Sequence, residues 1–446
     1  MINLLHNRRS HTASETAGSL QAHARRLLER WGGAPLLFFA LLPDKRYLFG
    51  ESDGRGWGIA YRVVGRHALA LGDPLGDPGA APDAVAAFLD LCRRQGWRPS
   101  FYQVTATHLD AYRAAGLRSV KVGEDAQIGL ADFSLAGKRF KNLRNDLRRI
   151  EKAGVALEVW GPDAPPSAEA VADMAAISEG WRRARRAKEG SFAMGGFAPD
   201  SDLFRASRYF VARDTASGRM LAFTTFVPVF GVGRTRGWAL DLMRRRPDAL
   251  HGVMDFLIIS AAQRFGEEGA DMVSLGLSPL AGADDDSETA ALSHVRRFLF
   301  TRLNRVYNFQ GLHTFKSKFA TDWEARYLIS RRGMGMAATA GAILKAHLAG
   351  DDRPPPSTQA GRSGRRRMMA LAALLLLVFT PFEKTLAKRA AVLPRRVAQT
   401  WGHPSLHWHS GHRHSGRWDT RQWDRVLPRL GHVRRASAAD VNALVG

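Results

Sequence analysis

The chain has 446 residues, 45% of them hydrophobic, enough to bury a full core and form two or three domains. Lysine and arginine (65) outnumber the acidic residues (42), and the net charge of +23 favours polyanionic partners, nucleic acid or acidic lipid, over a merely solvated basic surface. The single cysteine, Cys92, excludes an internal disulfide framework and fits a reducing cytoplasm. Because Cys92 lies in an apolar stretch, we expect a buried structural thiol.

After an N-terminal helical lead-in (1–34), short β-type runs alternate with helical ones along residues 35–136. The pattern predicts strands over 36–42, 58–64, 68–72 and 100–104, and helices over 82–95 and 108–115. Gly96 and Gly116 follow the two helices and are typical helix stops. Strands and helices interleaved at this spacing indicate a domain built on a sheet, of α/β or α+β type.

A polar helix is predicted over 137–153. Four apolar residues form one narrow stripe along it: Phe140, Leu143, Leu147 and Ile150. The opposite half carries the basic residues Lys138, Lys141, Arg144, Arg148, Arg149 and Lys152. An ordinary exposed helix mixes glutamate with lysine, and only Asp146 and Glu151 dilute this one. We therefore predict that its basic face contacts phosphates, with an ordinary exposed helix as the alternative.

Residues 154–333 repeat the sheet-building pattern. It predicts strands over 209–213, 220–230, 236–243 and 272–277, and helices over 253–268 and 292–303. Strand, hairpin, strand, helix, strand, helix is the order expected of a GCN5-related acyltransferase fold. The predicted fold class is thus α+β with a mixed sheet, as two tandem acyltransferase-like domains, 35–136 and 154–333, joined by the basic helix 137–153.

A proline-containing linker (334–360) leads to a basic tail (361–446) that holds more than half of the net charge. The tail contains one apolar segment, 368–382, directly after three arginines. As a helix this segment spans roughly 22 Å, short of the ~30 Å hydrocarbon core, so it spans a membrane under strain, anchors at the interface, or packs in a small extra domain. The tail is expected to be largely unstructured or membrane-associated. Its histidines, without a cysteine or carboxylate partner, are weak evidence for a metal, and no metal site is predicted.

Nine stretches together resemble the cytosolic synthase domain of the bacterial phosphatidylglycerol lysyltransferases. They occur in family order between about residues 35 and 330. They are 71–77 (LGDPLGD), 96–104 (GWRPSFYQV), 121–126 (KVGEDA), 133–144 (FSLAGKRFKNLR), 241–249 (DLMRRRPDA), 254–257 (MDFL), 275–282 (LGLSPLAG), 307–312 (YNFQGL) and 315–319 (FKSKF). The chain departs from the full-length family pattern in two ways, since it lacks the polytopic flippase region and carries a tail without a match.

The resemblance implies an enzyme that transfers an amino acid, lysine or alanine, from aminoacyl-tRNA to a glycerol hydroxyl of phosphatidylglycerol. It further implies that the enzyme acts at the cytoplasmic face of the bacterial inner membrane. The implied consequence is a lower negative charge of the membrane and resistance to cationic peptides. The donor ester is already activated, and the chain has neither a GxxxxGK[ST] loop nor a clear acyl-CoA pyrophosphate loop. No cofactor is therefore expected.

Three residues in the matched motifs are the predicted catalytic residues: Asp241, Arg244 and Lys316. Asp241 is suited to steer a donor ammonium, Arg244 to grip a phosphate, and Lys316 to hold the lipid phosphodiester or the developing oxyanion. A surface salt bridge is the alternative for Asp241 with Arg244. The predicted substrate-binding residues are Tyr307, Asn308, Gln310, Asp255 and Ser278, and those predicted to bind tRNA are Lys138, Lys141, Arg144, Arg148 and Lys152.

Two other classes of function stay open. One is an acyltransferase that uses acyl-CoA or acts on another lipid. The other is a non-catalytic protein that binds RNA or membranes through the basic helix and tail. No Ser-His-Asp arrangement is visible, so direct transfer is favoured over a covalent acyl-enzyme, and the general base and the oligomeric state are left undetermined.

Overall fold

The computed structural model describes residues 13–185, 189–279, 281, 309–331 and 336–348. The N-terminal part begins with helix α1 (Ala13–Trp31) and the 3₁₀ helix η1 (Pro35–Leu41). Its strands are β1 (Arg46–Ser52), β2 (Arg55–Val64), β3 (His67–Leu71), β4 (Leu75–Gly76), β5 (Arg98–Val104) and β6 (Leu117–Gly129). Its other helices are η2 (Pro78–Ala80), α2 (Ala81–Gln95) and α3 (Leu109–Ala114).

Helix α4 (Lys141–Lys152) leads into the second part. The strands that follow are β7 (Val155–Trp160), β8 (Arg208–Asp214), β9 (Met220–Gly231), β10 (Arg234–Arg245), β11 (Met272–Pro279) and β12 (Asp322–Arg331). The helices are α5 (Ala168–Arg185), α6 (Asp202–Ala206), α7 (Val253–Glu267), α9 (Phe309–Ser317) and α10 (Met336–Leu348).

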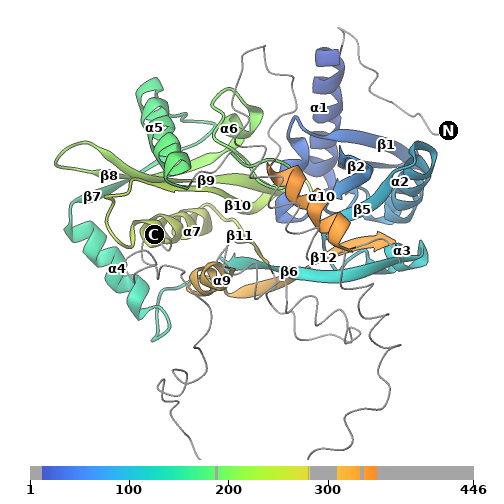
Figure 1. Cartoon of the computed structure of the whole chain (residues 1–446). Helices are drawn as coiled ribbons and strands as arrows, with labels where there is room; N and C mark the ends of the chain where they lie inside the picture. Colours follow the sequence, from blue (N-terminus) through green and yellow to red (C-terminus); the bar gives the residue numbers. More distant parts are fainter. Residues whose placement is uncertain (1–12, 186–188, 280, 282–308, 332–335, 349–446) are drawn as a thin grey trace, which may run out of the picture. The chain divides into compact units, whose positions relative to one another are not determined.

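Within the described residues, twelve strands form one mixed sheet, ordered β1-β2-β3-β5-β12-β6-β11-β10-β9-β8-β7, with β4 paired to β2 (Figure 1). Two pairs are parallel, β3 with β5 and β10 with β11, and the other pairs are antiparallel. The expected mixed α/β sheet is confirmed. The late strand β12 lies between the early strands β5 and β6, so the sheet crosses the proposed boundary between domains 35–136 and 154–333, whose division stays a prediction.

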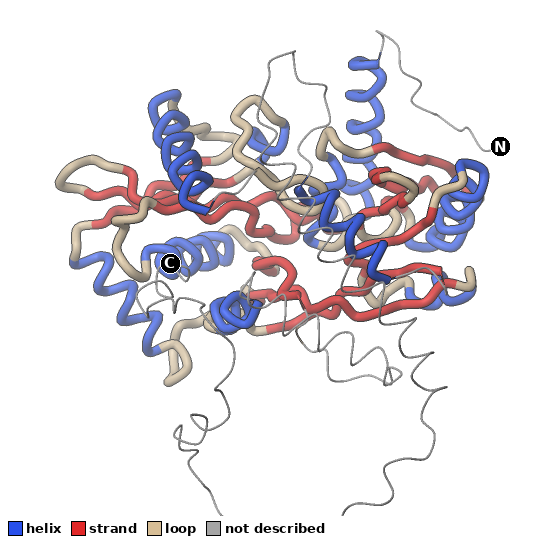
Figure 2. Tube along the Cα trace, viewed as in Figure 1, coloured by secondary structure: helices blue, strands red, loops and turns tan. Residues whose placement is uncertain are grey.

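Apolar clusters bury both faces of the sheet, and Figure 2 shows helices placed on either side of the strands. In the first part, α2 packs on β1, β2 and β5 around Phe88 and Phe101. In the second, α7 packs on β8 to β11 around Phe226 and Phe265. Helix α5 covers the opposite face of β9 and β10 around Met174 (Figure 1).

One predicted element is wrong, and two other predictions lie outside the described residues. A strand was predicted over 36–42, and this prediction is wrong, because residues 35–41 form the 3₁₀ helix η1. Pro35 fixes φ at the first helical position, and all seven residues of η1 are buried, so an uninterrupted apolar run here marks burial and not extended backbone. The helix expected over 292–303 and the tail lie outside the described residues.

Candidate functional site

Strands β10 and β11 separate at their carboxyl ends. They pair in parallel only from Gly237 to Ala239 with Met272 to Ser274. Beyond this, residues 240–245 of β10 pair only with β9, and residues 275–279 of β11 pair only with β6. Both strands have a register shift at this point, and Gly276 takes a φ of +81°. We call these two segments the strand fork, and the predicted catalytic residues lie on it or contact it.

Asp241 lies on the β10 side of the fork. Its Oδ1 accepts a hydrogen bond from the backbone N–H of Gly195 at 2.9 Å, while Oδ2 is buried and has no hydrogen-bond partner in the described part of the chain. Burial raises the pKa of the Asp241 carboxyl to about 7, opposed by the Gly195 N–H and by the charge of Arg244. A carboxyl poised near neutral pH with one free oxygen is suited to take or give a proton.

Arg244, three residues further along β10, is buried beside the loop of residues 189–197, which contains Gly195. Its Nη2 donates to Glu189 Oε2 at 2.9 Å, and its guanidinium lies 3.6 Å from the ring centroid of Trp181 in α5. This is neither a surface salt bridge with Asp241 nor a guanidinium turned to solvent. Arg244 therefore ties β10 to α5 and to Glu189, and it contributes positive charge near Asp241.

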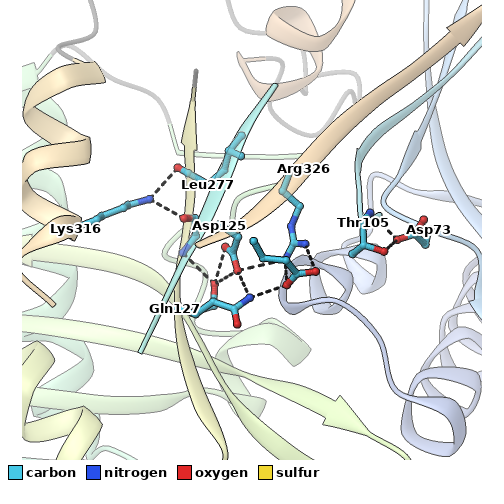
Figure 3. A network of polar contacts seen from close by, with 10 residues as sticks. Asp73, Thr105, Asp125, Gln127, Leu277, Lys316 and Arg326 are labelled. Atoms are coloured by element: carbon cyan, nitrogen blue, oxygen red, sulfur yellow. Dashed lines mark hydrogen bonds and ion pairs between the residues drawn. The ribbon is translucent and has the colours of Figure 1, made fainter. Parts of the chain in front are cut away.

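Lys316 contacts the β11 side of the fork from α9. Its Nζ donates to the carbonyls of Gly276 at 3.0 Å and Leu277 at 2.8 Å (Figure 3). Burial lowers the pKa of Lys316 to about 8, opposed by the negative charge of Asp125. Lys316 thus satisfies two main-chain carbonyls where β11 parts from β10, and it places a buried amine there.

A buried polar network that the sequence motifs did not predict lies behind Lys316. Asp125 of β6 accepts from Ser274 at 2.8 Å and from Gln127 at 3.0 Å, and Arg326 of β12 contacts it at 3.3 Å (Figure 3). Arg326 also pairs with Glu324 at 2.6 Å. The matched stretch 121–126 contained Asp125, but its partner Arg326 was undetectable because nothing in the sequence placed β12 beside β6.

The other parallel pair, β3 with β5, is closed at the corresponding end. Asp73 follows β3, and its Oδ2 accepts from the Thr105 N–H at 2.9 Å and from the Thr105 hydroxyl at 2.8 Å (Figure 3). Gly72 N–H also donates to the Tyr102 carbonyl at 2.8 Å. Asp73 therefore bridges the ends of these two strands, which leaves the fork of β10 and β11 as the more open of the two parallel pairs.

Of the predicted substrate-binding residues, two are buried and make polar contacts, and the side chains of the other three lie outside the described residues. Asp255, in the first turn of α7, is buried and accepts from Lys318 Nζ at 2.9 Å. Ser278 of β11 is buried with its hydroxyl 3.4 Å from His313 Nδ1. Tyr307 and Asn308 lie outside the described residues, as does the side chain of Gln310.

The predicted phosphate-binding helix forms as expected over most of its length. Leu143 and Ile150 of α4 are buried against the core shared with α7, and Phe140 and Leu147 join them. Arg144 is different from its neighbours, since it donates to the carbonyls of Leu135 and Gly137. The remaining predicted residues are exposed, and no ion pair within the described ranges involves them: Lys138, Lys141, Arg148 and Lys152.

The three predicted catalytic residues fall into two clusters. Asp241 and Arg244 share the loop of residues 189–197, and Arg244 reaches α5. Lys316 belongs to α9. Phe315 of α9 and Phe319, which follows the end of this helix, pack in the core cluster of α7. No hydrogen bond or ion pair between described residues joins the two clusters, so their joint action on one substrate stays a prediction.

Comparisons with known proteins find a family profile and several similar proteins. The sequence profile of the family "Phosphatidylglycerol lysyltransferase, C-terminal" matches residues 25–330. The phosphatidylglycerol lysyltransferase of Bacillus subtilis is 30% identical over 313 residues, 70% of this chain and 35% of that protein. A lysylphosphatidylglycerol biosynthesis bifunctional protein (LysX) of Mycobacterium avium is 30% identical over 341 residues, 73% of this chain and 28% of that protein. The chain thus spans about a third of the length of these relatives.

Two solved structures are similar over nearly their full length. One is the C-terminal domain of an Agrobacterium fabrum protein assigned as a lysylphosphatidylglycerol synthetase, with TM-score 0.64 and 30% identity, covering 75% of this chain and 99% of that one. The other is L-PGS from Bacillus licheniformis, with TM-score 0.61 and 29% identity, covering 74% of this chain and 97% of that one.

Proposed function

Because the chain belongs to the family of phosphatidylglycerol lysyltransferase C-terminal domains, we propose that it transfers an aminoacyl group from aminoacyl-tRNA to phosphatidylglycerol. The observation that carries the proposal is the extent of the match, since residues 25–330 include the whole strand fork with Asp241, Arg244 and Lys316. The phospholipid substrate is the one in the names of the relatives. Lysine and alanine are the proposed amino acids, and loss of membrane negative charge, with resistance to cationic peptides, is the proposed consequence.

The reaction exchanges one alcohol of an ester for another. A glycerol hydroxyl oxygen attacks the ester carbonyl carbon, the new C–O bond forms, and the bond to the ribose oxygen breaks. One proton passes from the glycerol hydroxyl to the ribose hydroxyl, so the step needs no other reactant. We assign the proton relay to Asp241, because its pKa of about 7 lets it accept a proton and return it at neutral pH.

Lys316 and Arg244 act in this proposal by charge and position. Lys316 holds the Gly276 and Leu277 carbonyls and supplies a buried amine to the β11 side of the fork. Arg244 keeps a guanidinium near Asp241 on the β10 side. In this proposal both favour the negative charge that develops on the ester carbonyl oxygen and attract the fixed negative charge of the lipid phosphodiester.

The tRNA is proposed to bind along α4. Lys141, Arg148 and Lys152 are spaced by seven and four residues, so they form one stripe about 16 Å long on the helix. Their ammonium and guanidinium groups are exposed, and within the described residues no carboxylate pairs with them. A stripe of uncompensated positive charge is suited to follow a phosphate backbone.

The acceptor lipid requires contact with the cytoplasmic face of a membrane. Helices in the described residues are all too short or too polar to cross a bilayer. We propose that the basic tail 361–446, with its apolar segment 368–382, provides the attachment. Deletion of 361–446 is expected to move the protein from the membrane fraction to the soluble fraction, whereas an unchanged distribution would place lipid binding in the remaining chain.

The transfer itself is tested with purified protein, radiolabelled Lys-tRNA or Ala-tRNA, and vesicles that contain phosphatidylglycerol. Label is expected in the extracted lipid, and it should be lost after ribonuclease treatment or with phosphatidylcholine vesicles. Asp241→Ala should remove the labelling, whereas Asp110→Ala, at an exposed carboxylate of α3, should not. Transfer from acetyl-CoA in place of aminoacyl-tRNA, or binding of tRNA and vesicles without any lipid product, would contradict the proposal.

A further inference from the structure

The loop of residues 189–197 sets the surroundings of Asp241. Its Gly195 N–H donates to Asp241 Oδ1 at 2.9 Å. Its Glu189 Oε2 accepts from Arg244 at 2.9 Å and from the Phe197 N–H at 3.2 Å. A Cβ atom at position 195 would lie 2.3 Å from Asp241 Oδ2, so only glycine lets the backbone come this close. Any displacement of the loop therefore changes the hydrogen bonding and charge around Asp241.

The far side of this loop is held by a buried charged cluster from the first part of the chain. Phe192 N–H donates to Asp44 Oδ2 at 3.1 Å, and Lys45 Nζ donates to the Phe192 carbonyl at 2.9 Å. Arg62 of β2 pairs with Asp44 at 2.9 Å. Phe192 is fully buried with a φ of +69°, a conformation that a non-glycine residue keeps only when its surroundings hold it.

Helix α10 completes this cluster. The Ala346 carbonyl, in the last turn of α10, accepts from Arg62 at 3.0 Å and from the Ser191 hydroxyl at 2.8 Å. The His347 ring packs edge-on against Phe192 with centroids 5.5 Å apart. The cluster contains two buried positive charges, on Lys45 and Arg62, and one negative charge, on Asp44. The carbonyl end of α10 offsets the excess of positive charge. α10 lies beyond residues 25–330, the part that the family profile matches.

We propose that Arg62 is a positioning residue for the transfer reaction: together with Asp44 and the end of α10 it holds the 189–197 loop so that the Gly195 N–H stays on Asp241. Arg62 acts through Ser191 and, by way of Asp44, through Phe192, and it is not assigned any contact with the reacting atoms. Its effect on catalysis rests on the proposed function, whereas its effect on the loop does not. The C-terminal helix thereby becomes part of the support of the site.

The test uses Arg62→Met in the full chain, with Arg93→Met as the matched control, since Arg93 is an exposed arginine of α2. Ser191→Ala is a milder second variant, because it removes one hydroxyl and leaves no buried charge alone. Hydrogen exchange of peptides that cover 189–197 should quicken in Arg62→Met and Ser191→Ala and stay unchanged in Arg93→Met. Asp241→Ala should quicken the same peptides, because it removes the acceptor for Gly195.

The catalytic part is read from the pH dependence of transfer. The groups that face Asp241 are Arg244 on β10, Glu189 on the loop and Tyr209 on β8. Loss of the Gly195 hydrogen bond should move the acid midpoint of kcat upward by about half a pH unit or more. kcat should fall by about tenfold, with KM for tRNA and for vesicles unchanged. Combining Arg62→Met with Gly195→Ala should add little to Gly195→Ala alone, since both act on one hydrogen bond.

Two results would overturn the proposal. One is a lower thermal midpoint in Arg62→Met and Ser191→Ala with loop exchange unchanged. The other is quicker hydrogen exchange of the loop while the acid midpoint of kcat stays where it is in the wild type. Additive effects of Arg62→Met and Gly195→Ala on kcat would have the same meaning, since either result would make Arg62 merely structural. If the wild-type chain transfers no aminoacyl group, the proposed function is wrong, but the positioning of the loop is still tested. Hydrogen exchange of residues 189–197 in Arg62→Met and Asp241→Ala then decides whether the charged cluster holds this loop.

Discussion

The buried carboxyl of Asp241 gives the fold a pH dependence that an exposed aspartate would not. Its pKa rises from an ordinary value of 3.8 to about 7 on folding, chiefly because burial disfavours the charged form. The folded state thus binds the proton more tightly, and ionisation of Asp241 costs stability as the pH rises through this window. Asp241→Asn keeps an acceptor for Gly195 without the charge. Its stability advantage over wild type should grow by roughly 2 to 3 kcal/mol between pH 5 and pH 8.

Urea unfolding at the two pH values measures this difference, and Asp110→Asn is the control, because that carboxylate is exposed. The same Asp241→Asn variant should lose transfer activity at both pH values, since an amide cannot relay a proton. A stability difference that does not change with pH would show that Asp241 keeps an ordinary pKa in the folded protein and would remove the reason for assigning it the proton relay.

Lys316 links stability to the β11 side of the strand fork. Lys316→Met keeps most of the side-chain volume but leaves the Gly276 and Leu277 carbonyls without their donor. We expect a loss of about 2 kcal/mol in the free energy of unfolding and at least tenfold lower transfer activity. Lys121→Met is the control, since Lys121 pairs with Glu124 on β6 and has no part in the site. Full activity in Lys316→Met would exclude a catalytic contribution of the amine.

At the scale of single elements, α4 carries the prediction for RNA binding. Lys141→Ala combined with Arg148→Ala removes two unpaired charges from one stripe. Arg93→Ala with Arg94→Ala removes two charges from α2 that already pair with Asp90. The α4 variant should raise the Kd for tRNA by about tenfold and lower the slope of log Kd against log salt by about two, one for each phosphate contact. The α2 variant should change neither, and equal effects of both would indicate a non-specific attraction.

Elements with a clear period were the predictable ones. The apolar stripe of α4, the helices α2 and α7, and the strands β2, β5 and β9 follow from apolar spacing and from the glycines that end them. The 3₁₀ helix η1 was missed, because a fully apolar run has no period that separates strand from helix. The long strand β6 was not predicted either, since its thirteen residues mix buried and polar positions on a strand that two neighbours share.

The candidate site was predictable only where one motif carried it. Asp241 and Arg244 stand three apart at the end of one predicted strand, so the sequence places them near each other along the chain. Side chains alternate faces along a regular strand, and a register shift between Leu240 and Met243, which the sequence did not predict, interrupts this alternation. The loop that contacts them could not be predicted, because Gly195 and Glu189 lie about fifty residues earlier and meet β10 only in the folded chain. The partners Asp125 and Arg326 are 201 residues apart and meet only because β12 returns to the first part of the sheet.

That return of β12 couples the two parts of the molecule. β12 pairs with β5 on one side and β6 on the other, and β6 pairs with β11. Arg326 of β12 is almost fully buried between Asp125 and Glu324. The first part of the sheet therefore cannot close without a strand from the end of the second, and we expect the sheet to unfold in one cooperative step.

Arg326→Met tests this coupling, because it leaves Asp125 buried without its cation and should cost about 3 to 5 kcal/mol. Glu324→Gln, at the exposed end of the same cluster, should cost far less. Cys92 is buried in the core of the first part, so its reaction with a thiol reagent reports the opening of that core. Thiol labelling and the loss of circular dichroism should shift together to lower urea in Arg326→Met. Labelling that precedes the loss of circular dichroism would mean that the first part opens alone and that β12 does not bind the sheet into one unit.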